Sequence, residues 1–355
     1  MPNGFVNIFT YFKFFYIKLK SYIIYIYNMA TLKTTDLKET IKQARPNVKD
    51  STIKMYESNL KKLQKMFDAT DWVFLKDVED VKDKIKHLHY TSQRNYFNSI
   101  IILLMALNSE NKQDELLSKY NTMRDNLNKQ YEDDNATGKI SDKQKANFVD
   151  IKVVKDGIEA MGKELKSKNF KKTDNLSAKD KTLLMVYILF QIHIRLPLRN
   201  DLAGAMAITK RAYTKLSEED KKANNYLIVE KGKMFLAINK FKTSKKFEAL
   251  NIDIPKDLEK LLRTYIKING MGILFKTSTG KALTRNALSQ LLIKFSKIYM
   301  GGKSISTTLM RKIVLSDLFL EKNKAQKAMS EITGHSVETM NNVYVKEGQG
   351  KEDKS

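Results

Sequence analysis

The chain has 355 residues, enough for two domains, and Lys and Arg outnumber Asp and Glu by 64 to 40, a formal net charge of +24 at pH 7. This charge favours a polyanionic partner, because each phosphate neutralised by a basic side chain releases counterions; the lysine-rich bias of an AT-rich genome is the alternative explanation. The absence of cysteine excludes disulfides, thiolate nucleophiles and cysteine-bound zinc. The four histidines include no HExxH pair, so we expect an intracellular protein that uses no metal or cofactor.

The beginning of the chain is apolar but carries too many charges for a membrane span. Residues 5–27 are rich in aromatic and aliphatic side chains and are interrupted by three lysines, which a lipid-spanning helix rarely tolerates. Met29 then opens a segment typical of a soluble N-terminus. We expect residues 1–44 to be an N-terminal extension, disordered or upstream of the true start, with no stable membrane association. A basic amphipathic anchor is the alternative.

The next part of the sequence predicts a compact helical domain. Apolar residues between 51 and 67 recur at steps of three and four, the period of an amphipathic helix. Trp72 is expected to anchor the core of this domain. Three more helices are predicted at 77–88, 91–107 and 112–132.

A polar stretch with turn-forming residues separates this domain from a second one. In the second domain, the apolar run Leu183–Ile192 predicts a buried helix that ends before Pro197, and His193 is expected to be a packed core residue. Residues 225–254 predict a three-stranded antiparallel meander. The fold class is therefore mainly α with a small antiparallel β meander (α+β). The predicted boundaries are 45–133 for the helical domain, 134–143 for the linker, 144–345 for the second domain and 346–355 for a flexible tail.

Four short motifs in the second domain carry candidate functional residues. RLPLRNDLAG contains Arg199, and NKFKTSKK contains Lys242 in the predicted meander. STTLMRKIV places Arg311 24 positions before His335 (335 minus 311). ITGHSVETMNNVY places His335 nine positions before Tyr344 (344 minus 335). Their order, spacing and predicted context point to one joint site.

These motifs resemble those of the tyrosine recombinase (phage integrase) family. That family has a TGLRxxEL turn, a KTGKK hairpin with a catalytic lysine, an HxLRH helix, and an LGHS turn followed by the nucleophilic tyrosine. The Arg-Asn-Asp form of the first motif looks like that of integrases of giant DNA viruses and virophages. The resemblance implies a helical core-binding domain and a catalytic domain that form a C-shaped clamp on double-stranded DNA.

The resemblance also implies an activity and partners. A DNA strand transferase of this type cuts and rejoins DNA through a 3′-phosphotyrosine intermediate, works as a homo-tetramer on paired sites and can require accessory DNA-bending proteins. Integration of a viral or mobile genome is the implied role. The implied location is the nucleus or viral factory of a host cell, or the virion.

The chemistry of such a reaction explains the residue types. Arginine remains charged and donates two parallel hydrogen bonds, so Arg199 and Arg311 suit the two non-bridging oxygens of a phosphodiester. Tyr344 would be the nucleophile and would store the bond energy as an aryl phosphodiester. Lys242 would protonate the leaving 5′ oxygen. His335 would donate to a non-bridging oxygen or handle the tyrosyl proton.

Two positions depart from the family pattern. Thr308 stands where the family has the histidine three residues before the second arginine; its hydroxyl can donate to phosphate but cannot shuttle a proton as histidine does. Leu202 stands at the usual acidic position, and Asp201 comes one residue earlier. Asp201 could still orient arginine or histidine side chains.

Two alternative functions follow from the same sequence. A type IB topoisomerase uses the same catalytic residues and would act alone on one strand, without site preference. A non-catalytic DNA-binding relative is the other alternative, and Thr308 is its only support. The intact Tyr344, both arginines and Lys242 argue against it.

Overall fold

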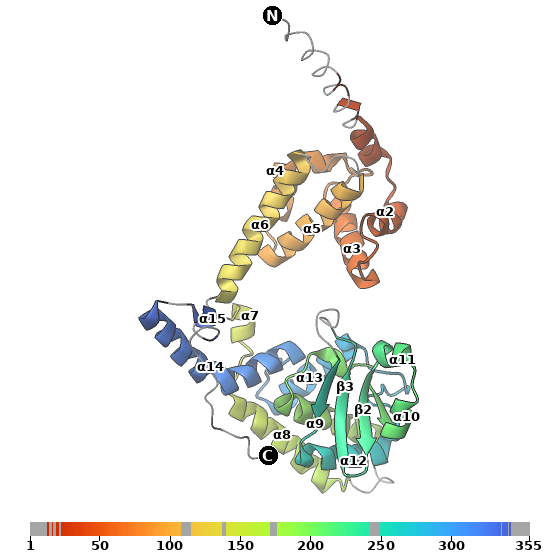
Figure 1. Ribbon diagram of the computed structural model, residues 1–355, viewed down its shortest axis with the longest axis vertical. Coiled ribbons are helices and arrows are strands. Elements are labelled where there is room, and N and C mark those ends of the chain that lie inside the picture. The colour runs from red at the N-terminus through yellow and green to blue at the C-terminus, as the bar shows by residue number, and fades with distance from the viewer. Residues whose placement is uncertain are drawn as a thin grey trace, which may run out of the picture. The chain divides into compact units, whose positions relative to one another are not determined.

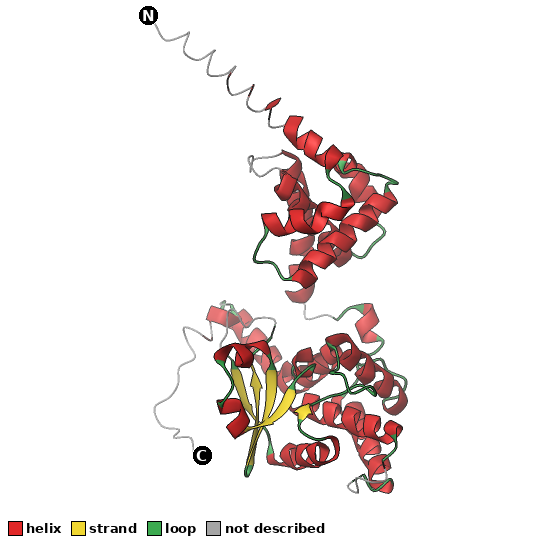
Figure 2. Cartoon of the chain, turned by 90° about the vertical axis from the view of Figure 1, so that its right-hand side faces the viewer, coloured by secondary structure: helices red, strands yellow, loops and turns green. Residues whose placement is uncertain are grey.

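The structure is a computed structural model that describes residues 13, 16, 19, 20, 23–107, 115–136, 140–170, 176–241, 249–334, 336–339 and 341. Contacts within the chain divide it into two compact units, Met1–Lys139 and Ile140–Ser355 (Figure 1). The described part of the first unit is helical, whereas the second unit combines helices with a sheet (Figure 2). Each unit has its own apolar core.

The first unit packs its helices around α5, whose nine buried residues include Phe97 and Leu104. Trp72 is fully buried, as predicted, and its indole Nε1 donates to the carbonyl oxygen of Leu32 at 3.0 Å. The helices predicted between residues 51 and 132 are present. The elements are a helical stretch at 23–31, η1 (Thr34–Asp36), α2 (Leu37–Ala44), α3 (Asp50–Met66), η2 (Val73–Lys76), α4 (Val78–Ile85), α5 (Tyr90–Leu107) and α6 (Glu115–Ala136).

Part of the segment assigned above to an N-terminal extension belongs to this core. Tyr25 and Met29 are buried one helical turn apart, and the backbone N–H of Trp72 donates to the Met29 carbonyl oxygen at 3.1 Å. α2 adds Leu37 and Ile41, both fully buried. The expected boundary at residue 45 is therefore wrong for residues 25–44. The lysines that argued against a membrane span precede these residues, so they do not prevent the following turns from packing.

The second unit surrounds α9 with helices and one sheet. α9 carries the predicted buried run and ends at Arg195, two residues before Pro197. The helices are α7 (Asp142–Lys145), α8 (Ile151–Ser167), α9 (Ala178–Arg195), η4 (Asn200–Leu202), α10 (Lys210–Thr214), α11 (Glu218–Ala223), α12 (Lys256–Asn269), α13 (Arg285–Tyr299), α14 (Thr307–Thr333) and α15 (Val337–Thr339).

The sheet is mixed and has the strand order β4-β3-β2-β1-β5. The three predicted strands do run antiparallel to their neighbours in sequence. The expectation of a purely antiparallel meander was nevertheless incomplete, because β1 pairs parallel to β2 and antiparallel to β5. One sheet face joins the main core, and the other carries a small apolar cluster with Tyr213 of α10. The strands are β1 (Met206–Thr209), β2 (Asn225–Glu230), β3 (Lys233–Ile238), β4 (Leu250–Asp253) and β5 (Gly272–Ile273).

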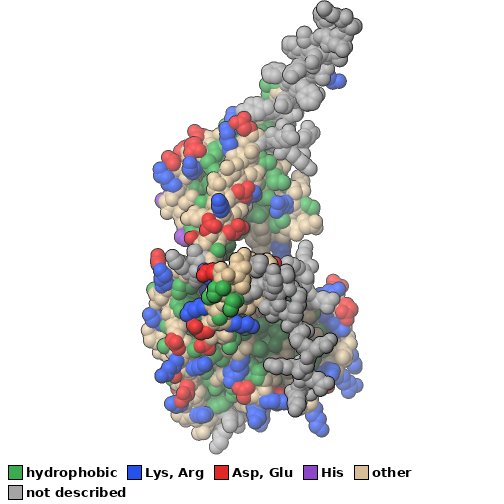
Figure 3. Space-filling model, turned by 60° about the vertical axis from the view of Figure 1, so that its left-hand side comes forward, with side chains coloured by type: hydrophobic (Ala, Val, Ile, Leu, Met, Phe, Trp, Pro, Cys, Tyr) green, Lys and Arg blue, Asp and Glu red, His purple; other side chains and the backbone are tan. Residues whose placement is uncertain are grey.

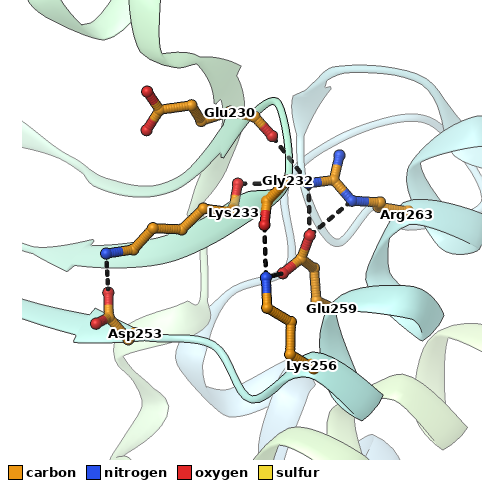
Figure 4. Close-up of polar contacts among 7 residues, drawn as sticks. All are labelled: Glu230, Gly232, Lys233, Asp253, Lys256, Glu259 and Arg263. Atoms are coloured by element: carbon orange, nitrogen blue, oxygen red, sulfur yellow. Dashed lines mark hydrogen bonds and ion pairs between the residues drawn. The ribbon is translucent and has the colours of Figure 1, made fainter. Parts of the chain in front are cut away.

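A polar network holds α12 against the turn between β2 and β3 (Figure 4). Glu259 is buried and pairs with Arg263 at 2.6 Å, and Arg263 also donates to the Glu230 carbonyl oxygen at 2.8 Å. Lys256 donates to the Gly232 carbonyl oxygen. The Arg263 guanidinium is the main cause of the lowered pKa of Glu259. A buried carboxylate paired in this way fixes the end of the hairpin to the helix.

Among the residues that the structure describes, no helix is both long and apolar enough to cross a bilayer. The clamp predicted from the sequence concerns how the two units sit together, and it remains a prediction.

Candidate active site

The turn after α9 presents Arg199. Leu196 caps the helix and Pro197 prevents its continuation. Arg199 then has an extended backbone as the residue before η4, and its side chain is exposed. Asp201, two residues later, is only 6% exposed. The sequence thus folds locally into a turn that exposes Arg199 and buries the carboxyl group of Asp201.

Arg311 lies on the second turn of α14, and its side chain is half-buried. Burial lowers the pKa of its guanidinium, the charge of Arg199 lowers it further, and Asp201 opposes both effects. The effect of the Arg199 charge on Arg311 shows that the two guanidinium groups lie near each other, although the residues are 112 positions apart in sequence (311 minus 199). An arginine remains charged under such a shift, because its intrinsic pKa is above 12.

Asp201 is the acidic group that these cations share. Burial raises the pKa of its carboxyl group, while the charges of Arg285, Arg199 and Arg311 act to lower it. Arg285, at the start of α13, forms an ion pair with Asp201 at 3.3 Å between Nη2 and Oδ1. Three guanidinium groups around one carboxylate leave a surplus of positive charge. The sequence analysis missed Arg285, because nothing local distinguishes it from a solvated arginine in the first turn of a helix.

Asn225 connects the arginine turn to the end of the predicted lysine hairpin. Its side-chain Nδ2 donates to the carbonyl oxygens of Asp201 at 2.6 Å and Lys240 at 3.0 Å. Its Oδ1 accepts from the backbone N–H groups of Asn239 and Lys240. The backbone two residues before Lys242 is therefore tied to the turn that carries Arg199. Lys242 itself lies outside the described residues.

Thr308 lies one helical turn before Arg311 and is exposed, whereas the preceding Thr307 is buried. Residues three apart on a helix share a face, so the Thr308 hydroxyl lies on the same side of α14 as Arg311. Ser306 caps the helix by accepting from the Leu309 N–H. The exposed hydroxyl favours a polar role for Thr308 over a packing role.

His335 and Tyr344 lie outside the described residues, but the helix that leads to them constrains the site. α14 is continuous to Thr333, and Gly334 ends it in a left-handed conformation with φ 68°. At 1.5 Å per residue, Gly334 is about 35 Å from Arg311 along the helix axis. In this conformation the chain does not bring the residue before His335 to the arginine pair.

A second basic surface lies on α3 of the first unit. A shallow groove of about 440 Å³ is lined by four lysines, Glu57 and Ser58. Lys61 pairs with Glu57, at 2.6 Å. Elsewhere, Lys and Arg side chains are interspersed with Asp and Glu over the visible surface (Figure 3). The lysines of the groove are Lys54, Lys61, Lys62 and Lys65.

The arginine pair has the chemistry of a phosphate-binding site. Two guanidinium groups can donate to both non-bridging oxygens of a phosphodiester and stabilise charge that develops there. Within the described ranges, no group of three or more His, Cys, Asp or Glu side chains is placed to hold a metal ion. The guanidinium groups of Arg199 and Arg311 are cations that can neutralise such charge.

Comparisons with known proteins give little support from sequence. No protein-family model matches the chain, and no curated protein matches it. Among solved structures, the crystal structure of XerA recombinase is similar at a TM-score of 0.32 and 12% sequence identity, covering 89% of this chain and 95% of that chain. A TM-score of this size does not establish a shared fold.

Proposed function

We propose that this protein cuts and rejoins double-stranded DNA through a 3′-phosphotyrosine formed by Tyr344. The observation that carries the proposal is that Arg199 and the buried Asp201 both lie near enough to Arg311 for their charges to act on its guanidinium group. The two arginines come from the two motifs that resemble the arginine motifs of tyrosine recombinases. The net charge of +24 suits a nucleic-acid partner.

In the proposed reaction, the Tyr344 oxygen attacks the phosphorus and breaks its bond to the 5′ oxygen of the next nucleotide. Arg199 and Arg311 neutralise the charge that develops on the non-bridging oxygens. The tyrosyl proton passes to His335 or solvent, and Lys242 protonates the leaving 5′ oxygen. Attack of a 5′ hydroxyl on the phosphotyrosine reverses these steps and releases the tyrosine, so the reaction needs no external energy source.

The proposal extends to a homo-tetramer on paired DNA sites. Exposed apolar residues of α14 support self-association: Leu315, Leu318, Met329 and Ile332 are all at least 38% exposed. Their steps of three, eleven and three place them on one stripe of the helix. This stripe favours a recombinase over a topoisomerase that acts as a monomer. Accessory DNA-bending proteins belong to the same proposal.

The biological role follows from the sequence resemblance alone. The Arg-Asn-Asp motif supports integration of a viral or mobile genome, with the protein acting in a host nucleus, in a viral factory or from a virion. The C-shaped clamp, with the groove of α3 on the DNA backbone, is the arrangement that we propose for the two units.

The decisive experiment traps the covalent complex on a nicked DNA substrate that cannot be religated. The wild type should form an SDS-resistant adduct, and Tyr344→Phe should form none while binding the duplex normally. Tyr299→Phe is the matched control: the Tyr299 hydroxyl donates to Glu164, and burial, followed by that hydrogen bond, raises its pKa to about 12. An adduct that survives Tyr344→Phe and disappears with Tyr299→Phe would overturn the assignment.

A further inference from the structure

Three buried polar atoms near the arginine pair have no hydrogen-bond partner among the residues that the structure describes: His193 Nε2, Asn200 Oδ1 and Arg311 Nε. Buried polar groups are nearly always hydrogen-bonded, so unpaired ones at a candidate site need an explanation. One of these atoms is a donor, since an arginine Nε always carries hydrogen. The other two atoms can accept a hydrogen bond, so either of them could pair with the Arg311 Nε–H.

His193 lies on the last turn of α9 and is fully buried. Its Nδ1 is 2.8 Å from the carbonyl oxygen of Leu189. Because a carbonyl oxygen only accepts, Nδ1 carries the proton and Nε2 presents a lone pair in the neutral ring. Burial keeps the ring neutral by lowering the pKa of His193 to about 4.

The Arg311 side chain lies close enough for its charge to lower the pKa of His193 as well. α14, which carries Arg311, packs against α9, which carries His193. Arg311 and His193 therefore place an unpaired N–H donor and an unpaired nitrogen acceptor on two helices in contact. A neutral acceptor suits this place, because a second carboxylate beside Asp201 would further reduce the positive charge available to a phosphate.

We propose that His193 is a positioning residue that accepts a hydrogen bond from Arg311 Nε and so aims the outer edge of the guanidinium at a phosphodiester. When His193 accepts the hydrogen bond from Nε, the two Nη nitrogens of Arg311 remain free to donate two parallel hydrogen bonds to phosphate oxygens. Asp201 contributes charge to the same arginine but leaves its Nε unpaired. The inference rests on the proposed function for the identity of the anion.

The test uses three variants of the full chain. His193→Gln keeps an acceptor near the position of Nε2, His193→Leu removes it, and Asn200→Ala removes the other candidate acceptor. In single-turnover adduct formation on the nicked substrate, His193→Leu should be slower by about 10²-fold, the usual effect of a small misplacement. Its affinity for duplex DNA should be unchanged, and His193→Gln should recover most of the rate.

A double-mutant cycle separates positioning from packing. Arg311→Lys has no Nε–H, so adding His193→Leu to it should slow the reaction no further. If the rate reductions of His193→Leu and Arg311→Lys multiply in the double variant, His193 has a packing role and the proposal is overturned. A His193→Gln variant as slow as His193→Leu would have the same meaning. A loss of rate with Asn200→Ala and none with His193→Leu would assign the acceptor to Asn200 instead.

A second measurement does not depend on catalysis. Nitrogen NMR of labelled wild-type protein should show the His193 Nε2 resonance shift when inorganic phosphate is added, and Arg311→Lys should abolish that shift. If the wild type forms no adduct but the shift appears, the proposed function fails and the positioning role stands. If adducts form without any shift, the positioning role is refuted and the proposed function stands.

Discussion

Arg285 forms an ion pair with Asp201, and the charges of Arg199 and Arg311 also act on this carboxylate, so the fold gathers three guanidinium groups near it. Asp201 offsets only part of the repulsion in this cluster, because burial and Arg199 together still act against the charge of Arg311. An incoming phosphate relieves this repulsion. Relief of this repulsion therefore contributes to the free energy of binding a phosphodiester.

Thr308 tests whether the departure from the family motif is functional. Its exposed hydroxyl shares a face with Arg311, so Thr308→Val should remove one hydrogen bond to the transition state and slow single-turnover cleavage by roughly 10²–10³-fold. DNA binding should change little, since the substitution leaves all basic side chains in place. Thr308→His should keep or raise the rate. A Thr308→Val enzyme that cleaves at the wild-type rate would exclude a catalytic role.

His193 also makes a prediction about pH. Its pKa is lowered to about 4 in the folded protein, against about 6.5 in an unfolded chain. The unfolded state therefore binds the proton first, and the stability contributed by neutral His193 is present above pH 6.5 and is lost as the pH falls to 4. The loss amounts to about 3 kcal/mol.

Chemical unfolding of wild type and His193→Leu between pH 4 and 7 measures this effect. The difference between the two unfolding free energies should change with pH, because only the wild type contains His193. The carboxylates titrate in both proteins, so their contributions cancel. A difference that stays constant across this range would mean that His193 is not a buried neutral imidazole.

Local motifs in the sequence singled out Arg199 and Arg311, and the structure places Arg199 close enough for its charge to lower the pKa of Arg311. Their catalytic roles remain predictions. Arg285 and Asn225 could not be predicted, because their partner Asp201 is 84 and 24 positions away. Only the folded chain defines contacts of this kind.

At the scale of elements, long periodic segments were predictable and short ones were not. The apolar periodicity of residues 51–67 predicted α3, and the apolar run Leu183–Ile192 predicted α9. β1 has four residues and β5 has two, too few for a period, and both exist because their neighbours offer hydrogen-bonding edges. The parallel pairing of β1 and β2 depends on the intervening α10 and α11, which no local pattern reveals.

The helical stretch 23–31 makes a prediction about the N-terminus. A chain that begins at Met29 loses the buried Tyr25 and the hydrogen bond from Asn28 Nδ2 to the Leu107 carbonyl oxygen. We expect its first unit to lose about 3 kcal/mol of unfolding free energy, the usual cost of deleting a buried aromatic side chain. A chain that begins at Ile23 is the control and should match the full-length protein in thermal melting. Equal stability of both truncated chains would show that these residues are not part of the core.

At the scale of the whole molecule, the length of α14 is the feature with the largest consequence. The rigid helix puts Gly334 about 35 Å from Arg311. Tyr344 can act in its own chain only if the ten residues after Gly334 run back along α14, over most of that distance. The alternative is that the tyrosine of a second copy completes the proposed site. The exposed apolar stripe of α14 offers a surface on which such copies could meet.

Complementation between two inactive variants tests this consequence. Arg311→Ala keeps Tyr344 but lacks a phosphate-binding arginine, and Tyr344→Phe keeps both arginines but lacks the nucleophile. Neither should form an adduct alone. Their mixture should form one if the tyrosine acts on a neighbouring site, and a size tag should show the DNA attached to the Arg311→Ala chain. Adding Leu318→Glu to both variants should reduce the yield, because Leu318 is 60% exposed on the stripe and a charge there opposes self-association. A mixture that stays inactive beside an active wild type would mean that the tyrosine acts within its own chain.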